Sequence, residues 1–272
     1  MIESCVTIAL VKQIRTGPWI FWDNLEQSMA RASEMGFDAI ELFTSSAAAV
    51  DPKALAPLLE KFNLKLAAVG TGAGKVLHGL TLTDPSEDLR KQAISFVSDM
   101  IAFGAVFGAP VIIGSMQGNL PNGQDRNQAL SWLAEGLRFL GHQAEEQGVA
   151  LIYEPLNRYE TNLLNTLEAG VHFIETENLR NVKLLADLFH MNIEEADMPA
   201  SIRAHANHIG HVHFADSNRR SVGYGHTEMG PIALALQESG YSGFVSAEAF
   251  PWPDPDAAAL QTIKSFRQFF RQ

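Results

Sequence analysis

Three carboxylates and one imidazole in the second half of the chain could act together, because each closes a short apolar run that predicts a β-strand. They are Glu154, Asp187, His213 and Glu248. Side chains alternate between the two faces of a strand, so Ala150, Ile152 and Glu154 share one face. His211 and His213 share a face in the same way, and His213 is the nearer of the two to the end of its strand. We therefore take His213 as a candidate ligand and His211 as a core residue.

The most economical partner for this set of side chains is a metal ion. Carboxylates brought together without a counter-ion repel one another, and a divalent cation removes that repulsion. An oxygen-rich set with a single imidazole suits Mn²⁺, Mg²⁺ or Co²⁺ better than a structural zinc. We expect one divalent metal ion, Mn²⁺ in the first place, held by Glu154, Asp187, His213 and Glu248.

The elements that must position these residues alternate regularly along the chain. Short apolar runs at 5–10, 39–43, 64–70, 111–114, 149–154, 182–187, 209–214 and 244–248 predict strands. Amphipathic stretches near 24–35, 51–62, 87–103, 126–147, 166–178, 199–206, 229–239 and 256–271 predict helices. Repeated β-then-α units indicate a parallel α/β sheet, and eight of them favour closure into a (β/α)8 TIM barrel.

The chain has no linker rich in proline and serine, so residues 1–272 are expected to form a single TIM-barrel domain. A barrel of this kind typically needs about 250 residues. Segments 70–86, 114–125 and 216–231 carry glycine or proline and follow predicted strands. Such loops would lie at the C-terminal mouth of the barrel, where barrel enzymes keep their active sites.

Composition excludes several classes of function. The net charge of −11 and the absence of a basic run argue against a nucleic-acid partner. Cys5 is the only cysteine, which rules out an intramolecular disulfide and a thiolate cluster. No apolar stretch reaches 18 residues, and MIESCVTIAL does not have the features of a signal peptide. We expect a cytoplasmic protein with no membrane partner and a small-molecule ligand.

Several longer motifs resemble one family. The runs EPLNRYETNLLNT, ADLFHMNIEE, HVHFADSNRR and SAEAF are similar to the sugar isomerase/epimerase group of xylose-isomerase-like TIM barrels. Within that group they resemble the ketose 3-epimerases that act on tagatose and psicose. With GTGAGKVLHGLTLTDP and FGAPVIIGSMQG included, the pattern looks closest to 5-keto-L-gluconate epimerase, which forms D-tagaturonate.

The resemblance implies a role for each matching residue. Glu154 and Glu248 would bind the metal and also form the catalytic acid/base pair, and Asp187 and His213 would complete the metal shell. Glu160, His190 and Arg219 match substrate-binding positions. The implied substrate is a small sugar or sugar acid, and similar barrels are often dimers or tetramers.

The physical logic agrees with an epimerase and leaves alternatives open. A cation that chelates the ketone oxygen and the neighbouring hydroxyl would stabilise the enediolate left by proton removal. Two carboxylates on opposite faces could then invert the carbon. An aldose–ketose isomerase or a dehydratase begins with the same enolisation and remains an alternative. A phosphodiester hydrolase is disfavoured by the negative charge, and a non-enzymatic sugar-binding protein by the two opposed glutamates.

Overall fold

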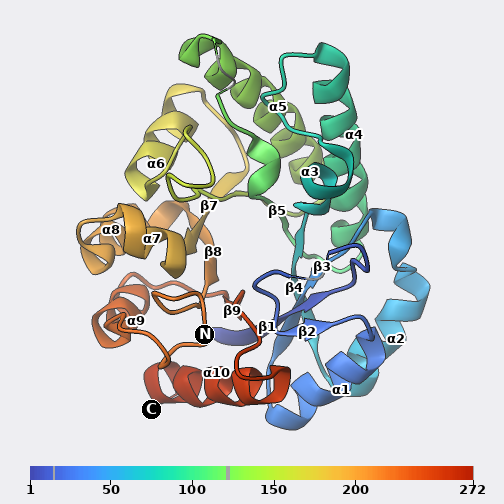
Figure 1. Cartoon of the computed structure of the whole chain (residues 1–272), viewed down its shortest axis with the longest axis vertical. Helices are drawn as coiled ribbons and strands as arrows, with labels where there is room; N and C mark the ends of the chain where they lie inside the picture. Colours follow the sequence, from blue (N-terminus) through green and yellow to red (C-terminus); the bar gives the residue numbers. More distant parts are fainter. Residues whose placement is uncertain (15, 121–122, 272) are drawn as a thin grey trace.

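The computed structural model describes residues 1–14, 16–120 and 123–271. Its strands form a closed parallel ring in chain order, surrounded by helices (Figure 1). The barrel strands are β1 (Glu3–Ala9), β3 (Ala39–Phe43), β4 (Lys65–Gly70), β5 (Val111–Ile113), β6 (Leu151–Tyr153), β7 (Val182–Asp187), β8 (Ile209–His213) and β9 (Phe244–Ala247). The ring closes where β1 pairs with β9, with Cys5 opposite Ser246. The predicted (β/α)8 TIM barrel is therefore confirmed.

A two-residue strand, β2 (Phe21–Trp22), completes the first strand at the mouth of the barrel. β9 pairs only with the first part of β1, from Glu3 to Val6. β2 pairs with the remainder, Ile8 and Ala9, and so covers a stretch of strand edge that β9 leaves free. The sequence did not predict this strand, because two residues carry no periodicity.

The principal helices agree with the predicted stretches to within a few residues at each end. They are α1 (Leu25–Met35), α2 (Pro52–Phe62), α4 (Glu87–Ala105), α5 (Arg126–Glu146), α6 (Leu167–Thr176), α8 (Met198–His205), α9 (Met229–Glu238) and α10 (Pro255–Phe270). Aspartate side chains accept backbone N–H groups at several N-termini, including Asp51 before α2 and Asp254 before α10. These caps, each followed by proline, are why those helices begin where the sequence indicated.

Two predicted loops contain short helices, which corrects the sequence interpretation. α3 (Ala73–His78) lies inside the expected loop 70–86, and a 3₁₀ turn (Ser115–Gln117) opens the expected loop 114–125. Residues 121–122 of that second loop lie outside the described part of the chain. A third short helix, α7 (Leu188–Glu194), directly follows β7.

β6 and β9 each end one residue earlier than predicted, at the C-terminal end that faces the mouth of the barrel. Glu154 and Glu248 are the first residues after β6 and β9, not the last residues within them. The Glu248 N–H donates to Ser246 O at 3.1 Å, within its own segment, so the chain has already left the ladder there. The side chain of Glu248 is therefore carried by the segment that leaves the barrel, whereas the Glu154 N–H still donates to Ile113 O of β5 at 3.0 Å.

The inside of the barrel is packed with small and branched side chains. Ala68, Ile112, Ile152 and Leu185 form one buried cluster there, from four neighbouring strands. A much larger core fills the space between the strands and the helices. Among the described residues, no helix is both long enough and apolar enough to cross a bilayer.

Candidate active site

The four predicted ligands come together at the C-terminal end of the barrel strands. Glu154 follows β6, Asp187 ends β7, His213 ends β8 and Glu248 follows β9. One ligand atom from each lies within 4.8 Å of the ligand atoms of the other three. Residues 94 positions apart in the sequence thus share a space that one ion could fill.

His213 lies at the centre of this group. Its Nδ1 is 3.2 Å from Asp187 Oδ2 and 3.6 Å from Glu154 Oε1. The same nitrogen is 3.6 Å from Glu248 Oε2. All three carboxylates therefore face one nitrogen of the ring.

Asp187 is held by the start of α7. Its Oδ1 accepts the backbone N–H groups of Phe189 (2.8 Å) and His190 (3.1 Å), which leaves Oδ2 to face His213. Burial raises the pKa of Asp187, but His190, His213 and Arg219 together outweigh burial and lower it below its ordinary value. Asp187 is thus an ionised carboxylate with one oxygen bonded to the backbone and the other directed to the centre of the group.

The carboxylate of Glu154 indicates whether a cation fits this group of four side chains. Its Oε1 is buried and has no hydrogen-bond partner within the described ranges. A buried carboxylate oxygen without a donor is costly, and a cation would satisfy it. The donor set of three carboxylates and one imidazole fits a divalent ion of the Mn²⁺ or Mg²⁺ type.

Glu248 and Arg219 form an ion pair at the edge of the group, with Arg219 Nη2 donating to Glu248 Oε2. Burial raises the pKa of Glu248 above its ordinary value, while Arg219 and His213 oppose the rise. The other end of the guanidinium lies 3.3 Å from Glu160 Oε1, and its centre lies 4.8 Å from the ring of Phe189. Arg219 is thus fixed between two carboxylates beside the predicted metal site.

His190 has its hydrogen-bond roles set by Asn157. The backbone N–H of Asn157 donates to His190 Nδ1 at 3.3 Å, and the Asn157 side-chain amide lies 2.7 Å from the same atom. Because Nδ1 accepts, the proton of the neutral ring sits on Nε2. That nitrogen is 3.8 Å from Glu154 Oε1 and lines the cavity. The structure therefore places Glu160, His190 and Arg219 beside the four predicted ligands.

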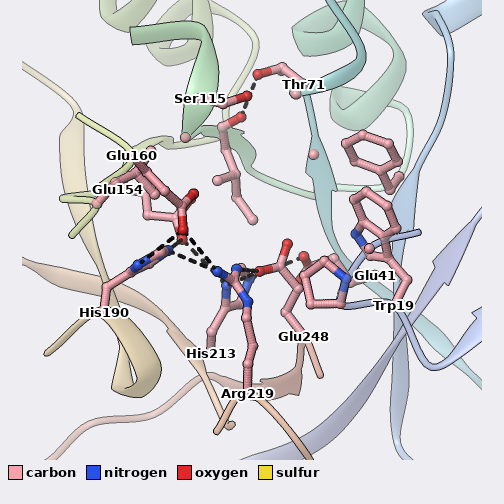
Figure 2. A pocket seen from close by; sticks show the side chains of 18 of the residues that line it. Trp19, Glu41, Thr71, Ser115, Glu154, Glu160, His190, His213, Arg219 and Glu248 are labelled. Atoms are coloured by element: carbon pink, nitrogen blue, oxygen red, sulfur yellow. Dashed lines mark hydrogen bonds and ion pairs between the residues drawn. The ribbon is translucent and has the colours of Figure 1, made fainter. Parts of the chain in front are cut away.

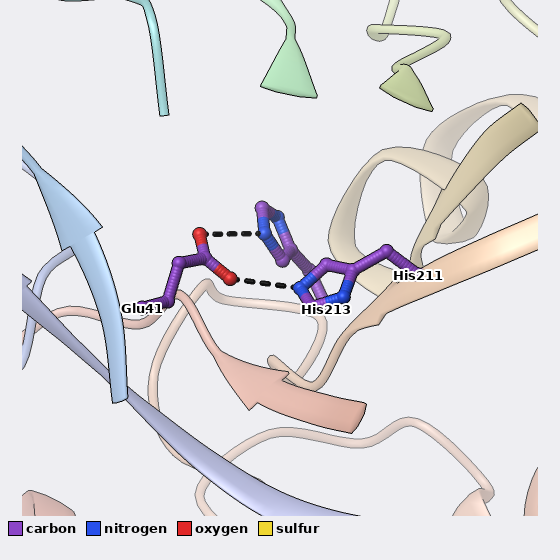
Figure 3. Close-up of side chains that lie close together, drawn as sticks. All are labelled: Glu41, His211 and His213. Atoms are coloured by element: carbon purple, nitrogen blue, oxygen red, sulfur yellow. Dashed lines mark hydrogen bonds and ion pairs between the residues drawn. The ribbon is translucent and has the colours of Figure 1, made fainter. Parts of the chain in front are cut away.

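Glu41 on β3 was missed by sequence reasoning. Figure 3 shows its carboxylate between two imidazoles, with Oε2 2.8 Å from His211 Nε2 and Oε1 3.2 Å from His213 Nε2. Burial lowers the pKa of His213, but Glu41 and Glu248 outweigh burial and hold it well above its ordinary value. An acidic residue inside the apolar strand AIELF was the available signal. His211 is buried, as expected of a core residue.

Asp216 was also missed, although it organises the loop that carries Arg219. Its Oδ1 accepts the N–H of Ser217 (2.7 Å) and of Thr227 (3.0 Å), and its Oδ2 accepts the N–H of Gly223 (2.8 Å). Its backbone carbonyl accepts the N–H of Arg219 at 2.8 Å. One buried carboxylate thus closes the loop on itself and fixes the backbone of Arg219.

These groups face a cavity of about 450 Å³, a size suited to a small molecule. Figure 2 shows Glu154, Glu160 and His190 on one side and Trp19 on the other. Trp19 stacks on Phe43 with ring centroids 4.1 Å apart, which makes an apolar wall opposite the carboxylates. A ligand that is polar at one end and carries a C–H-rich face would match both walls.

Comparison with known proteins agrees with this arrangement. The family model described as Xylose isomerase-like TIM barrel matches residues 29–269. D-psicose 3-epimerase of Ruminiclostridium cellulolyticum is 31% identical over 229 residues, which is 81% of this chain and 76% of that protein. 3-Dehydro-D-guloside 4-epimerase of Escherichia coli is 25% identical over 240 residues, covering 84% of this chain and 88% of that protein.

A solved structure described as L-ribulose 3-epimerase superimposes with a TM-score of 0.85 and 26% identity, over 100% of this chain and 95% of that one. The predicted resemblance to ketose 3-epimerases is therefore confirmed, while the closer resemblance to 5-keto-L-gluconate epimerase stays a prediction. With sugar epimerases as its relatives along most of its length, the chain is an enzyme of the isomerase class. It belongs to the xylose isomerase-like TIM barrel family.

Proposed function

We propose that the protein is a divalent-metal-dependent epimerase that inverts the carbon next to the ketone of a keto-sugar. One observation supports this proposal most strongly. Glu154 Oε1 and Glu248 Oε2 each lie 3.6 Å from His213 Nδ1, although the two glutamates follow different strands. In Figure 2 these two carboxylates enter the cavity from different sides. Inversion needs a proton acceptor on one face of the carbon and a proton donor on the other.

The metal ligands in this proposal are Glu154, Asp187, His213 and Glu248, with Mn²⁺ favoured and Mg²⁺ or Co²⁺ as alternatives. A divalent cation held there would supply positive charge that polarises the ketone and so makes the adjacent C–H more acidic.

The two glutamates would act on opposite faces of the carbon. One carboxylate removes the proton from the carbon next to the ketone, and the electron pair of that C–H bond moves into the enediolate. The other carboxyl group then delivers its proton to the opposite face, and the ketone re-forms with the carbon inverted.

Three further residues would bind the substrate and orient it. His190 presents Nε2–H as a donor, and Glu160 offers a half-exposed carboxylate oxygen at the rim. Arg219 brings a nearly buried guanidinium to the same rim. These donors and acceptors, grouped beside the two glutamates, match the hydroxyl groups of a sugar.

For the substrate we propose a six-carbon keto-sugar or keto-sugar acid. The resemblance of the sequence to 5-keto-L-gluconate epimerase favours the keto acid, with D-tagaturonate as the product. The names of the relatives, D-psicose 3-epimerase and L-ribulose 3-epimerase, favour a neutral ketose inverted at carbon 3. A cytoplasmic location, a dimer or tetramer, and a single domain over residues 1–272 stay predictions from the sequence.

The test is a panel of ketohexoses and ketohexuronates incubated with enzyme and Mn²⁺, with the products separated by chromatography. The proposal expects a product of the same mass that differs at one carbon next to the ketone. Turnover of neutral ketoses that exceeds that of ketohexuronates by orders of magnitude would remove the preference for a keto acid. An aldose product would instead identify an isomerase, and loss of water a dehydratase.

A further inference from the structure

We propose that Glu41 is a positioning residue that determines which nitrogen of His213 is available to a divalent cation. The inference rests on the proposed metal site and adds a residue from the opposite side of the barrel. Glu41 lies on β3 and His213 on β8, with 172 positions between them in the sequence. Both side chains are almost completely buried, at 6% and 2% exposure.

The geometry leaves little freedom to the two imidazole rings. An ionised carboxylate only accepts hydrogen bonds, so each imidazole nitrogen that it contacts must carry a proton. Glu41 Oε1 faces His213 Nε2 at 3.2 Å, and Glu41 Oε2 faces His211 Nε2 at 2.8 Å. Glu41 therefore holds the Nε2 proton of His213, so the proton that a metal ion would displace is the one on Nδ1.

The other nitrogen of His213 is the one that faces the three carboxylates. Its Nδ1 lies 3.2 Å from Asp187 Oδ2 and 3.6 Å from each of the two glutamates. A nitrogen binds a metal only through a free lone pair, and a ring whose Nε2–H is held offers that lone pair at Nδ1. A partner that holds the far N–H also fixes the orientation of a ligating ring and raises its basicity.

Glu41, His211 and His213 also lie close enough together to suggest an ion of their own. His213 cannot serve both groups at once, because a neutral imidazole keeps one N–H and only one free lone pair. Since the four-residue group has the orphaned oxygen of Glu154, the free lone pair belongs there. Glu41 then takes the hydrogen bond instead of a second ion.

His211 contributes to the same arrangement by orienting the carboxylate of Glu41. Glu41 comes from a strand that does not pair with β8, so nothing in the sheet ladder fixes the direction of its carboxylate. The hydrogen bond from His211 occupies one carboxylate oxygen and turns the other toward His213 (Figure 3). The spacing His-Val-His on β8 thus supplies a ligand and the residue that orients the ligand's partner.

The test compares Mn²⁺ binding by the parent, Glu41→Gln and Glu60→Gln, using calorimetry and the thermal unfolding of the metal-free proteins. Glu60 is an exposed glutamate on α2 and gives the same substitution away from the site. Loss of the partner of a ligating histidine typically weakens metal affinity by about 10- to 100-fold. We expect a loss in that range for Glu41→Gln, a metal-free unfolding midpoint like the parent's, and no change for Glu60→Gln.

The outcomes separate this inference from the proposed function. If the parent binds no Mn²⁺, the metal site itself is wrong. If the parent binds one ion per chain and Glu41→Gln binds it equally well, the role of Glu41 is wrong and the metal site stands. Two ions per chain in the parent would overturn the role of Glu41 as a hydrogen-bond acceptor.

A second measurement does not depend on how the variant folds. Long-range ¹H–¹⁵N spectra of the Mg²⁺-loaded parent report which ring nitrogen of His213 is protonated. The inference expects the proton on Nε2, and a proton on Nδ1 contradicts it.

Discussion

Gly114 and Glu154 lie so close together that a Cβ atom added to Gly114 would lie 2.2 Å from Glu154 Oε2. Gly114 directly follows β5 and Glu154 directly follows the neighbouring strand β6. The glutamate carboxylate thus occupies the space in which any other residue at 114 would place its side chain. The direction of Glu154 depends on a neighbour that carries no functional group.

Gly114→Ala should therefore displace the Glu154 carboxylate while leaving the barrel folded, because the atom in the way is the end of a flexible side chain. We expect kcat/KM to fall by at least about 10-fold, in line with the cost of misplacing a catalytic group by about 1 Å. Steady-state kinetics and thermal unfolding measure the two effects. Gly230→Ala is the matched control, since a Cβ there meets nothing within 4 Å. Parent-like kinetics for Gly114→Ala would show that the position of Glu154 is unimportant.

Glu154→Gln and Glu248→Gln each keep an oxygen but remove a group that can transfer a proton. General acid–base catalysis typically contributes about 10²–10⁴-fold, so each variant should lose at least that factor in kcat. The measurement is kcat at saturating Mn²⁺, where a weaker metal affinity no longer limits the rate. Near-normal kcat in both variants would exclude the two glutamates from the chemical step.

Metal binding should release a proton at neutral pH. Glu41 and Glu248 hold the pKa of His213 well above the ordinary 6.5 in spite of burial, so the metal-free ring carries both protons at pH 7. A ligating nitrogen must lose its proton, so Mn²⁺ affinity should rise about 10-fold per pH unit while the pH stays below that pKa. Calorimetry in two buffers of different ionisation enthalpy should find about one proton released per ion. An affinity independent of pH between 6 and 7, with no proton released, is the contrary result.

Arg219→Gln should weaken substrate recognition. Hydrogen bonds to charged groups are worth about 1.5–3 kcal/mol, so kcat/KM should fall by roughly 10- to 100-fold. Arg220→Gln is the control, because the Arg220 guanidinium lies over the ring of Trp252, 4.1 Å from its centroid. Equal effects in the two variants would mean that Arg219 has no special part in the site.

The strand order and the four predicted ligands could be derived from the sequence, because each depends on local periodicity. A parallel barrel brings the C-terminal ends of its strands to one mouth, so Asp187 and His213 had to lie close together once their strands were recognised. Glu154 and Glu248 followed by the same logic, although both lie one residue beyond their strands.

The residues that orient the predicted ligands could not be derived from periodicity, because each acts through contacts that the pattern along one strand does not contain. Glu41 contacts His213 across 172 positions, and Gly114 matters only for the space that it leaves to Glu154. Asp216 acts on the backbone of its own loop, which strand periodicity does not describe.

In the proposed mechanism one carboxylate removes a proton from one face of the carbon and the other delivers a different proton to the opposite face, and reaction in D₂O tests this most directly. Enzyme and Mn²⁺ are incubated with the best substrate of the panel, and NMR follows the carbon next to the ketone. The proposed mechanism predicts an epimer with the ketone in place and one solvent deuterium on the inverted carbon. An inverted product that retains the substrate hydrogen at that carbon, or a product whose carbonyl has moved, would contradict it.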